Sequence, residues 1–340
     1  MAYLVSRYPA ISHTFILREI QRLRAFGFEI DVASINDPDR PLKRMTPEER
    51  EEAEDVYYVK RDGAFGALRA HAATFARHPI AYLHGLAYAL SLGGWDLRAR
   101  LYGFFYFVEA VMVGRWMAGN GHTHLHVHFG GAGASVGLIA RRTFPITFSI
   151  MIHGPDEFYD VPGCLLAEKF AACDFVLTIG QYARSQVMRL LAPHAWGKID
   201  VTPLGVDVSL FQPAAQRDAT DPFEVLCVGR LVPAKGQHVL VSACARLIAD
   251  GRNLRLRIVG DGPDRATLEA AVAEAGIGDR VVFEGAVNQD RIRELYVGAD
   301  AFVLASFAEG IPVVLMEAMA MGVPCVTTCT TGHPELIRDG

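Results

Sequence analysis

The sequence is short of the features that mark disulfide-rich, secreted or nucleic-acid-binding proteins. Cysteine occurs only six times in 340 residues and never as a C-x-x-C pair, which favours reduced thiols in a packed core over a disulfide framework. Arg7 ends the apolar start of the chain after a few residues, so we expect no signal peptide and a cytoplasmic protein. Basic residues are not in excess, because the formal net charge is −5 and the isoelectric point about 6.2. A general nucleic-acid binder is therefore not expected.

The residues that are abundant indicate a folded chain with a large core. Apolar residues make up 51% of the sequence and charged residues 21%, a balance typical of globular rather than disordered proteins. At 340 residues the chain is long enough for two domains.

Short apolar runs alternate with segments of helical period in both halves, which predicts βαβ units and parallel sheets. We expect two doubly wound, Rossmann-like α/β domains facing a cleft, at 1–212 and 213–340, with a linker at 212–222. The expected strands are 3–6, 28–34, 56–59, 123–129, 146–152, 175–179, 223–229, 254–260, 281–285, 301–305 and 323–327. The expected helices are 13–26, 132–142, 181–191, 237–249, 265–275, 289–298 and 313–321.

Two cations follow the first strand expected in the C-terminal domain. In VGRLVPAKG (Val228–Gly236), Arg230 and Lys235 occupy a Gly/Pro loop beyond the carboxyl end of that strand, with no acidic residue nearby. Doubly wound sheets bind ligands at this edge, and two cations without an acidic partner suit a diphosphate. A solvated basic loop is the alternative interpretation.

A pair of glutamates occupies EGIPVVLMEAMAMGVP (Glu309–Pro324). Glu309 follows an expected strand, and a helix beginning at Val313 would leave the amides of its first turn free to bind an anion. Glu317 lies in the first turns of that helix, and a carboxylate accepts hydrogen bonds well from two neighbouring sugar hydroxyls. An exposed helix with ordinary surface glutamates is the alternative.

These two segments, with IVGDGP (Ile258–Pro263) and FEGAV (Phe283–Val287), resemble family 4 of the retaining glycosyltransferases of GT-B fold. The opening YPAISHTFILREIQRL and the later HVHF and MIHGPDEFYD resemble its bacterial exopolysaccharide branch, the colanic-acid-type enzymes. The resemblance covers nearly the whole chain. It implies transfer of a hexose from a UDP- or GDP-sugar to a glycan or polyprenyl-linked acceptor, with retention of configuration and without a metal or other cofactor.

The resemblance also implies roles for individual residues. The donor diphosphate would be held by Arg230, Lys235, Val313 and Val314, and the donor ribose by Glu317. Catalytic residues beside the reacting sugar would be His153 and Glu309. The loops around the donor sugar and base would contain Gly310, Ile311, Pro312, Gly260 and Val287.

On the acceptor side, the resemblance implies contacts from Ser12, His13, Thr14 and His128, with His13 standing where the family usually has an acid. The family normally continues beyond the point that corresponds to Gly340, with a further strand, a helix and a terminal helix that crosses back to the first domain. We therefore expect the C-terminal domain to be truncated relative to that pattern.

Two other functions stay open. The histidines of HTHLHVH (His122–His128) alternate, so on a strand they would share one face and supply zinc ligands to a metal-dependent hydrolase. A non-catalytic relative that only binds a sugar nucleotide is the second alternative.

Residues 60–118 are unusual for a sugar transferase domain, because seven Lys and Arg against three Asp and Glu interrupt a very apolar stretch. Glu109 and Arg115 divide its last apolar run, so we expect no transmembrane helix. Apolar helical faces dotted with Arg, His, Trp and Tyr suit an interfacial helix pair. We expect peripheral contact with the inner face of the cytoplasmic membrane, and helices packed on the domain's own sheet are the alternative.

Overall fold

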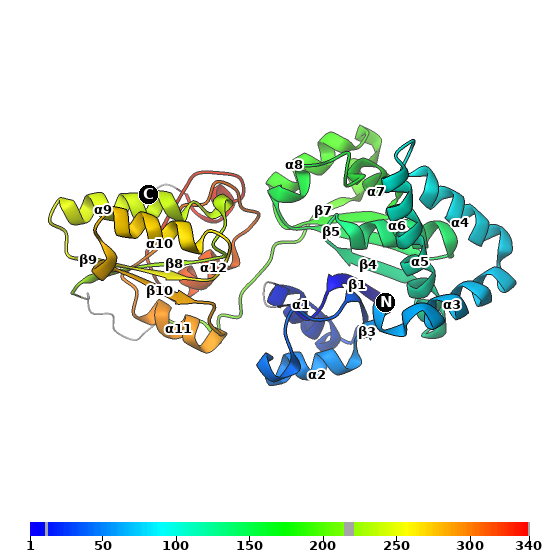
Figure 1. Ribbon diagram of the computed structural model, residues 1–340, viewed down its shortest axis with the longest axis horizontal. Coiled ribbons are helices and arrows are strands. Elements are labelled where there is room, and N and C mark those ends of the chain that lie inside the picture. Colours follow the sequence, from blue (N-terminus) through cyan, green and yellow to red (C-terminus); the bar gives the residue numbers. More distant parts are fainter. Residues whose placement is uncertain (11–12, 214–220, 339–340) are drawn as a thin grey trace. The chain divides into compact units, whose positions relative to one another are not determined.

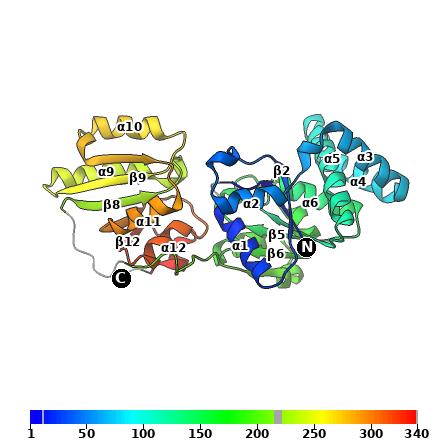
Figure 2. The same ribbon diagram turned by 90° about the horizontal axis from the view of Figure 1, so that it is seen from below.

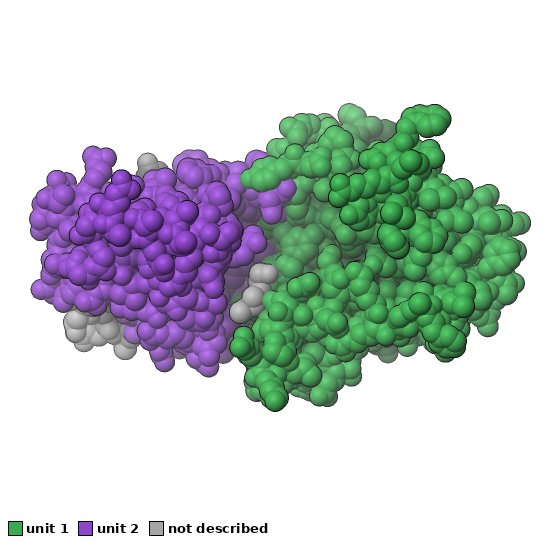
Figure 3. All heavy atoms as spheres, in the orientation of Figure 1, with its two compact units in different colours: residues 1–153, 157–179, 183–202 green, residues 154–156, 180–182, 203–340 purple. Residues whose placement is uncertain are grey.

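The computed structural model describes residues 1–10, 13–213 and 221–338, and both halves of the chain form parallel α/β sheets (Figure 1). Unit 1 comprises residues 1–153, 157–179 and 183–202, and unit 2 comprises residues 154–156, 180–182 and 203–340 (Figure 3). The division at 202/203 precedes the expected boundary at 212/213, because Phe211 is buried in the core of unit 2. Of the linker expected at 212–222, residues 214–220 lie outside the described residues.

Unit 1 is built on a seven-stranded sheet with the order β3-β2-β1-β4-β5-β6-β7, and all its neighbouring strands are parallel. The strands are β1 (Ala2–Arg7), β2 (Asp31–Asn36), β3 (Tyr57–Tyr58), β4 (His124–His128), β5 (Thr147–Ile152), β6 (Phe175–Thr178) and β7 (Ile199–Val201). The order reverses between β1 and β4. The carboxyl ends of these two strands therefore form the switch point at which such sheets bind ligands.

The helices of unit 1 are α1 (Thr14–Ala25), α2 (Pro47–Asp55), α3 (Gly63–Arg77), α4 (Pro79–Ser91), α5 (Leu97–Gly119), α6 (Ala132–Thr143), α7 (Leu166–Ala172) and α8 (Gln181–Leu190). One side of the sheet is covered by α1, which buries Ile16, Leu17 and Ile20 against β1 and β2. The other side is covered by α6. Its small residues permit close packing, since a Cβ at Gly137 would lie 2.4 Å from the Phe148 ring.

Residues 60–118 form three helices rather than the expected pair. Pro79 begins α4 directly after α3, and the turn that holds Gly93 and Gly94 separates α4 from α5. The second half of α5 is buried and packs on α6, α3 packs on α5, and α4 packs on both α5 and α6 (Figure 1). Among the described residues, no helix is both long enough and apolar enough to cross a bilayer.

Unit 2 contains a five-stranded parallel sheet with the order β10-β9-β8-β11-β12. Its strands are β8 (Phe223–Val228), β9 (Leu254–Val259), β10 (Val281–Gly285), β11 (Ala301–Leu304) and β12 (Cys325–Thr327). Its helices are α9 (Gln237–Ala249), α10 (Arg265–Glu274), α11 (Gln289–Val297), α12 (Val313–Ala320) and α13 (His333–Leu336). Figure 2 shows α9 and α10 on one face of the sheet and α11 and α12 on the other. The switch point of this sheet lies between β8 and β11.

Candidate functional site

An ion pair joins the loops that follow β8 and β11 at the switch point of unit 2, so the expectation that Lys235 has no acidic partner is wrong. Nζ of Lys235 lies 2.5 Å from Oε1 of Glu309, and the Ser306 hydroxyl donates to the same oxygen at 2.7 Å. Glu309 is only 8% exposed. Lys235 is only partly buried, but the buried carboxylate of Glu309 needs well-placed partners to offset its desolvation, and here one of its oxygens accepts from two donors.

Close backbone contacts hold these loops together. A Cβ on Gly260 (φ +131°) would lie 1.9 Å from the carbonyl oxygen of Gly229, and one on Gly236 (φ +62°) would lie 2.1 Å from that of Ala305. Glycine is therefore required at both positions for steric and conformational reasons. Gly260, the predicted base-side residue, thus packs against the loop that carries Arg230 and Lys235.

The remaining predicted donor-side residues follow the strands β8, β10 and β11 of unit 2. The Arg230 side chain is exposed, and its backbone carbonyl accepts a hydrogen bond from Nε2 of Gln237 at 2.8 Å. Val313 and Val314 are the first two residues of α12, and no other described residue accepts a hydrogen bond from their backbone amides. The loop before α12 contains Gly310, Ile311 and Pro312, and Val287 packs against the apolar cluster beneath α12.

Glu317 is buried and does not lie on an exposed helix face. Glu317 is a residue of α12 and is 4% exposed. Its Oε2 accepts a hydrogen bond from the Tyr296 hydroxyl at 3.2 Å. Burial, with the neighbouring charge of Glu317, raises the pKa of Tyr296 well above its usual value, so the phenol remains a donor. The surface-glutamate alternative is therefore wrong for both Glu309 and Glu317.

In unit 1, the structure brings His128 and His153 together at the carboxyl ends of β4 and β5. Nδ1 of His128 lies 2.9 Å from Nε2 of His153, and the two rings stack with centroids 5.1 Å apart. Burial, and then the charges of His128, His126 and His13, hold the pKa of His153 well below its usual value. His153 is therefore a neutral imidazole near pH 7.

Aromatic rings pack around His153 and connect it with the predicted acceptor side. The rings of Phe15 and Phe129 lie 4.8 and 4.6 Å from that of His153, and His13 contacts Phe129 at 4.9 Å. Thr14 begins α1 next to His13, whereas Ser12 lies outside the described residues. Phe129 has a φ of +70°, a conformation that costs about 1–3 kcal/mol and concentrates at functional sites.

Two charged residues that were not predicted as site residues hold these loops in place, the partly buried Glu157 and the buried Lys169. Glu157 accepts from the amide of His153 and from that of Gly130, both at 2.6 Å. The Lys169 ammonium donates to the carbonyls of Gly130 and Gly131 at 2.7 and 2.9 Å, and burial lowers the pKa of Lys169 to about 8. The loops after β4 and β5 are thus tied to each other and to α7.

The histidines of His122–His128 do not converge on one point. His122 pairs with Asp31 at 2.6 Å, while His124 and His126 both contact the hydroxyl of Ser149. Of these four histidines, only His126 and His128 belong to a group of neighbouring potential metal ligands among the described residues, so the hydrolase alternative is disfavoured.

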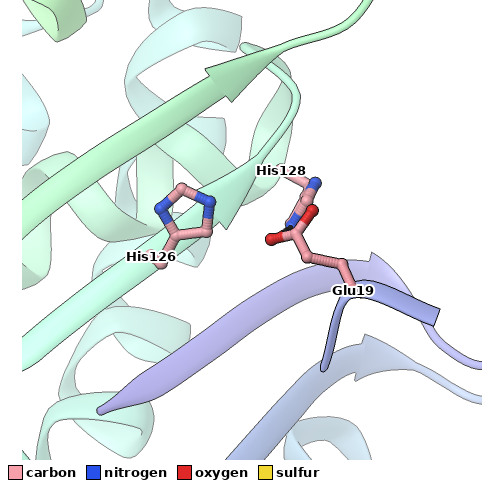
Figure 4. A group of neighbouring side chains, drawn as sticks. All are labelled: Glu19, His126 and His128. Atoms are coloured by element: carbon pink, nitrogen blue, oxygen red, sulfur yellow. Dashed lines mark ion pairs between the residues drawn. The ribbon is translucent and has the colours of Figure 1, made fainter. Parts of the chain in front are cut away.

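In the described part of the chain, the donor atoms of Glu19, His126 and His128 lie within 4.8 Å of one another (Figure 4). However, Oε1 of Glu19 accepts from Tyr3 at 2.8 Å and faces Nε2 of His128 at 3.5 Å. At 3.5 Å this contact is longer than an ordinary N–H···O hydrogen bond, and Nε2 of His128 has no hydrogen-bond partner among the described residues. Hydrogen on Nε2 would face the carboxylate, and a ring nitrogen that carries hydrogen does not bind a metal.

Comparison with known proteins bears on both halves of the chain. Residues 210–340 match the family described as Glycosyl transferases group 1. The chain is 26% identical to a provisionally named colanic acid biosynthesis glycosyltransferase of Escherichia coli strain K12, over 99% of this chain and 84% of that protein. It is 25% identical to the amylovoran biosynthesis glycosyltransferase of Erwinia amylovora, with the same coverage of both chains.

Solved structures share the fold of this chain. A complex of HepE from Anabaena with UDP-glucose has a TM-score of 0.69 at 16% identity, covering 99% of this chain and 83% of that one. The apo form of a lipopolysaccharide outer core galactosyltransferase has a TM-score of 0.64 at 18% identity, with the same coverage. At these identities the likeness shows the fold alone, which is the GT-B fold expected from the sequence.

Proposed function

We propose that this chain, whose residues 210–340 carry a Glycosyl transferases group 1 domain, is a retaining hexosyltransferase of exopolysaccharide biosynthesis. The observation that carries the proposal is the Lys235–Glu309 pair at the switch point of unit 2, in the loops after β8 and before α12, with the carboxylate buried and the ammonium partly exposed. Two relatives that are similar over 99% of the chain are named for colanic acid and amylovoran biosynthesis.

The donor in this proposal is a nucleotide-diphosphate sugar. Arg230, Lys235 and the amides at the start of α12 bind the diphosphate, and Glu317 binds the ribose hydroxyls. A solved neighbour holds UDP and glucose, and a relative that is 30% identical over 63% of the chain is named a GDP-mannose-dependent mannosyltransferase. These names support a UDP- or GDP-sugar as the donor.

The chemistry follows from where negative charge develops. As the glycosidic bond to the diphosphate breaks, the leaving group gains charge, which cations and helix amides stabilise in a dry site without a metal ion. Glu309 orients the Lys235 ammonium and lies against the hexose. His153, neutral because of its burial, exchanges hydrogen bonds with a sugar hydroxyl and carries no charge of its own. Retention follows from departure and attack on the same face of the sugar.

We further propose that the acceptor is lipid-linked and that the outer helices of unit 1 contact the inner face of the membrane. Nearly half of the large hydrophobic side chains that are exposed in the described part of the chain lie between residues 65 and 105. On α3 and α4 they recur on one face, as with Phe65 and Leu68, and Trp95 is 95% exposed. Arginines are scattered among these exposed apolar side chains, a pattern that is typical of helices at a membrane interface.

A cavity of about 490 Å³ lies in the same helical layer, between the segment that begins at Val59 and helices α3 and α5. Its lining is mostly apolar, with Lys60 and Glu109 as its charged members. This volume falls within the range of small-molecule pockets, and its apolar walls suit part of a lipid chain.

The experiment is a donor screen on the purified protein in EDTA. UDP- and GDP-sugars are tested for an upward shift in unfolding temperature, because a ligand that binds only the folded state stabilises it. Release of the nucleoside diphosphate is then measured with membrane lipid extract as the acceptor. We expect one donor class to bind and to turn over. Binding without turnover would favour the non-catalytic relative, and no binding of any nucleotide sugar would contradict the proposal.

A further inference from the structure

Three side chains from separate elements form a chain of contacts that ends at His153. Glu19 lies on α1, His128 ends β4, and His153 follows β5. Oε1 of Glu19 lies 3.5 Å from Nε2 of His128, whose Nδ1 lies 2.9 Å from Nε2 of His153. Figure 4 shows the carboxylate of Glu19 beside the ring of His128. All three residues belong to unit 1.

The carboxylate decides which nitrogen of His128 carries hydrogen. Burial alone would raise the pKa of Glu19, but the interactions with His128 and with the Tyr3 hydroxyl outweigh it and hold that pKa below its usual value. An ionised carboxylate only accepts hydrogen bonds. Nε2 of His128 is buried 3.5 Å from this carboxylate and has no hydrogen-bond partner among the described residues. In the neutral ring, hydrogen on Nε2 is therefore attracted to Glu19, since the other tautomer would set a nitrogen lone pair against a negative oxygen.

The same reasoning passes from His128 to His153. With hydrogen on its Nε2, neutral His128 offers a lone pair at Nδ1, and a ring nitrogen 2.9 Å away must then donate. His153 consequently carries its hydrogen on Nε2, and its Nδ1 is a lone-pair acceptor. Nδ1 of His153 is buried and has no hydrogen-bond partner among the described residues.

The orientation of the His153 ring is fixed from several directions. Phe15 and Phe129 pack on it, and Glu157 holds its backbone amide. The ring therefore cannot turn to satisfy Nδ1 elsewhere in unit 1. A buried acceptor without a partner costs about 1–3 kcal/mol, and a ligand hydroxyl that donates to it removes this penalty.

We propose that Glu19 and His128 are positioning residues that set His153 in the tautomer with hydrogen on Nε2, so that its Nδ1 accepts a hydrogen bond from a sugar hydroxyl. The identity of that ligand rests on the proposed function, whereas the tautomer is a property of the protein alone. A hydroxyl that donates its hydrogen to Nδ1 keeps its oxygen lone pairs free to face the reacting carbon. In hydrolytic triads a carboxylate orients one histidine directly. Here the carboxylate of Glu19 acts on His128, and His128 in turn orients His153.

The tautomer is measured by long-range ¹H–¹⁵N correlation on the full chain labelled with ¹⁵N-histidine, with His153→Gln used to assign the signal. We expect Nε2 to be protonated and Nδ1 unprotonated near pH 7. Glu19→Ala should replace this state by a mixture of tautomers, and Glu19→Gln should restore it in part, because the amide oxygen still accepts from His128. Glu29→Ala, which removes an exposed carboxylate of the same unit, serves as the control.

Turnover provides the second readout. Glu19→Ala and His128→Ala should lower kcat about tenfold to hundredfold, the usual cost of losing an orienting partner, while the Kd of the nucleoside diphosphate stays unchanged. His128→Asn should retain more activity than His128→Ala, because its amide oxygen can occupy the position of Nδ1. A protonated Nδ1 of His153 in the unmodified protein, or an unaltered tautomer in Glu19→Ala, would overturn the inference. Failure of every nucleotide sugar to bind would instead count against the proposed function and leave the tautomer result standing.

Discussion

The ammonium group of Lys235 lies 2.5 Å from Oε1 of Glu309, although 74 positions separate the two residues in the chain. Lys235 is in the loop after β8 and Glu309 in the loop after β11, and β8 and β11 are neighbours in the sheet. The glutamate therefore holds a cation at the edge where a doubly wound sheet binds its ligand. A diphosphate that reaches this edge meets a charge that is already oriented.

Replacing Lys235 with Ala should weaken donor binding. Loss of one charged hydrogen bond costs about 1.5–3 kcal/mol, which corresponds to a rise in Kd of roughly tenfold to hundredfold. Isothermal titration with the nucleoside diphosphate measures this change. Lys43→Ala, at an exposed position of unit 1, is the control, and equal affinities in the two variants would show that Lys235 does not bind the diphosphate.

Replacing Glu309 with Gln should reduce turnover more than donor affinity. The amide keeps the size of the side chain and accepts from Ser306, but it cannot hold the Lys235 ammonium by charge or assist at the sugar. We expect kcat to fall with little change in the Kd of the donor, a pattern that marks an interaction made in the transition state. A rise in KM with unchanged kcat would instead make Glu309 a plain binding residue.

Glu317→Ala should weaken binding of a nucleoside diphosphate without affecting inorganic pyrophosphate, because the carboxylate is assigned to ribose and not to phosphate. Competition titration with the two ligands separates these contributions. Tyr296→Phe removes the hydroxyl that contacts Glu317 at 3.2 Å and should cost stability of about 0.5–1.5 kcal/mol. If Glu317→Ala loses equal affinity for both ligands, the assignment of Glu317 to the ribose is contradicted.

The buried Lys169 predicts a pH dependence of stability. Its pKa falls from an ordinary 10.5 to about 8 in the folded protein. Between these values the unfolded chain binds more protons than the folded one, so the free energy of unfolding rises with pH across this window. Between pH 8 and 10.5, the free energy of unfolding of the unmodified protein should rise by on the order of 3 kcal/mol relative to that of Lys169→Met. Urea unfolding of both proteins tests this, and parallel pH profiles would contradict the low pKa.

The exposed helices of unit 1 predict binding to anionic vesicles. The full chain should cosediment with liposomes that contain phosphatidylglycerol at low salt, and less at high salt because the arginines are screened. Changing Phe65, Leu68 and Trp95 to Ser should abolish this binding. The matched control changes Leu247 and Val297, which are exposed in unit 2, to Ser. Failure of the unmodified protein to cosediment would refute the membrane contact.

Local periodicity predicted much of the fold. The predicted bounds were wrong where the burial of a residue depends on contacts with distant parts of the chain. The helix expected at 237–249 and the strand expected at 281–285 have the bounds of α9 and β10. The strand expected at 28–34 is instead β2 (Asp31–Asn36), because Phe28 and Glu29 are exposed before it begins. The three-residue β7 is too short to show a period, and only its pairing with β6 makes it a strand.

The sequence by itself determined the alternation of strands and helices and the loops in which ligand-binding side chains lie. Parallel strands end at one edge, so Lys235 and Glu309 could be assigned to that edge from their positions after strands alone. Only the tertiary structure decided that these two side chains form a pair and that Glu317 is buried against Tyr296. It also brought Glu19 to His128 across 109 positions of the chain. The physical reason is that periodicity reports which face of an element is buried, whereas the partner of a buried polar group depends on which elements pack together.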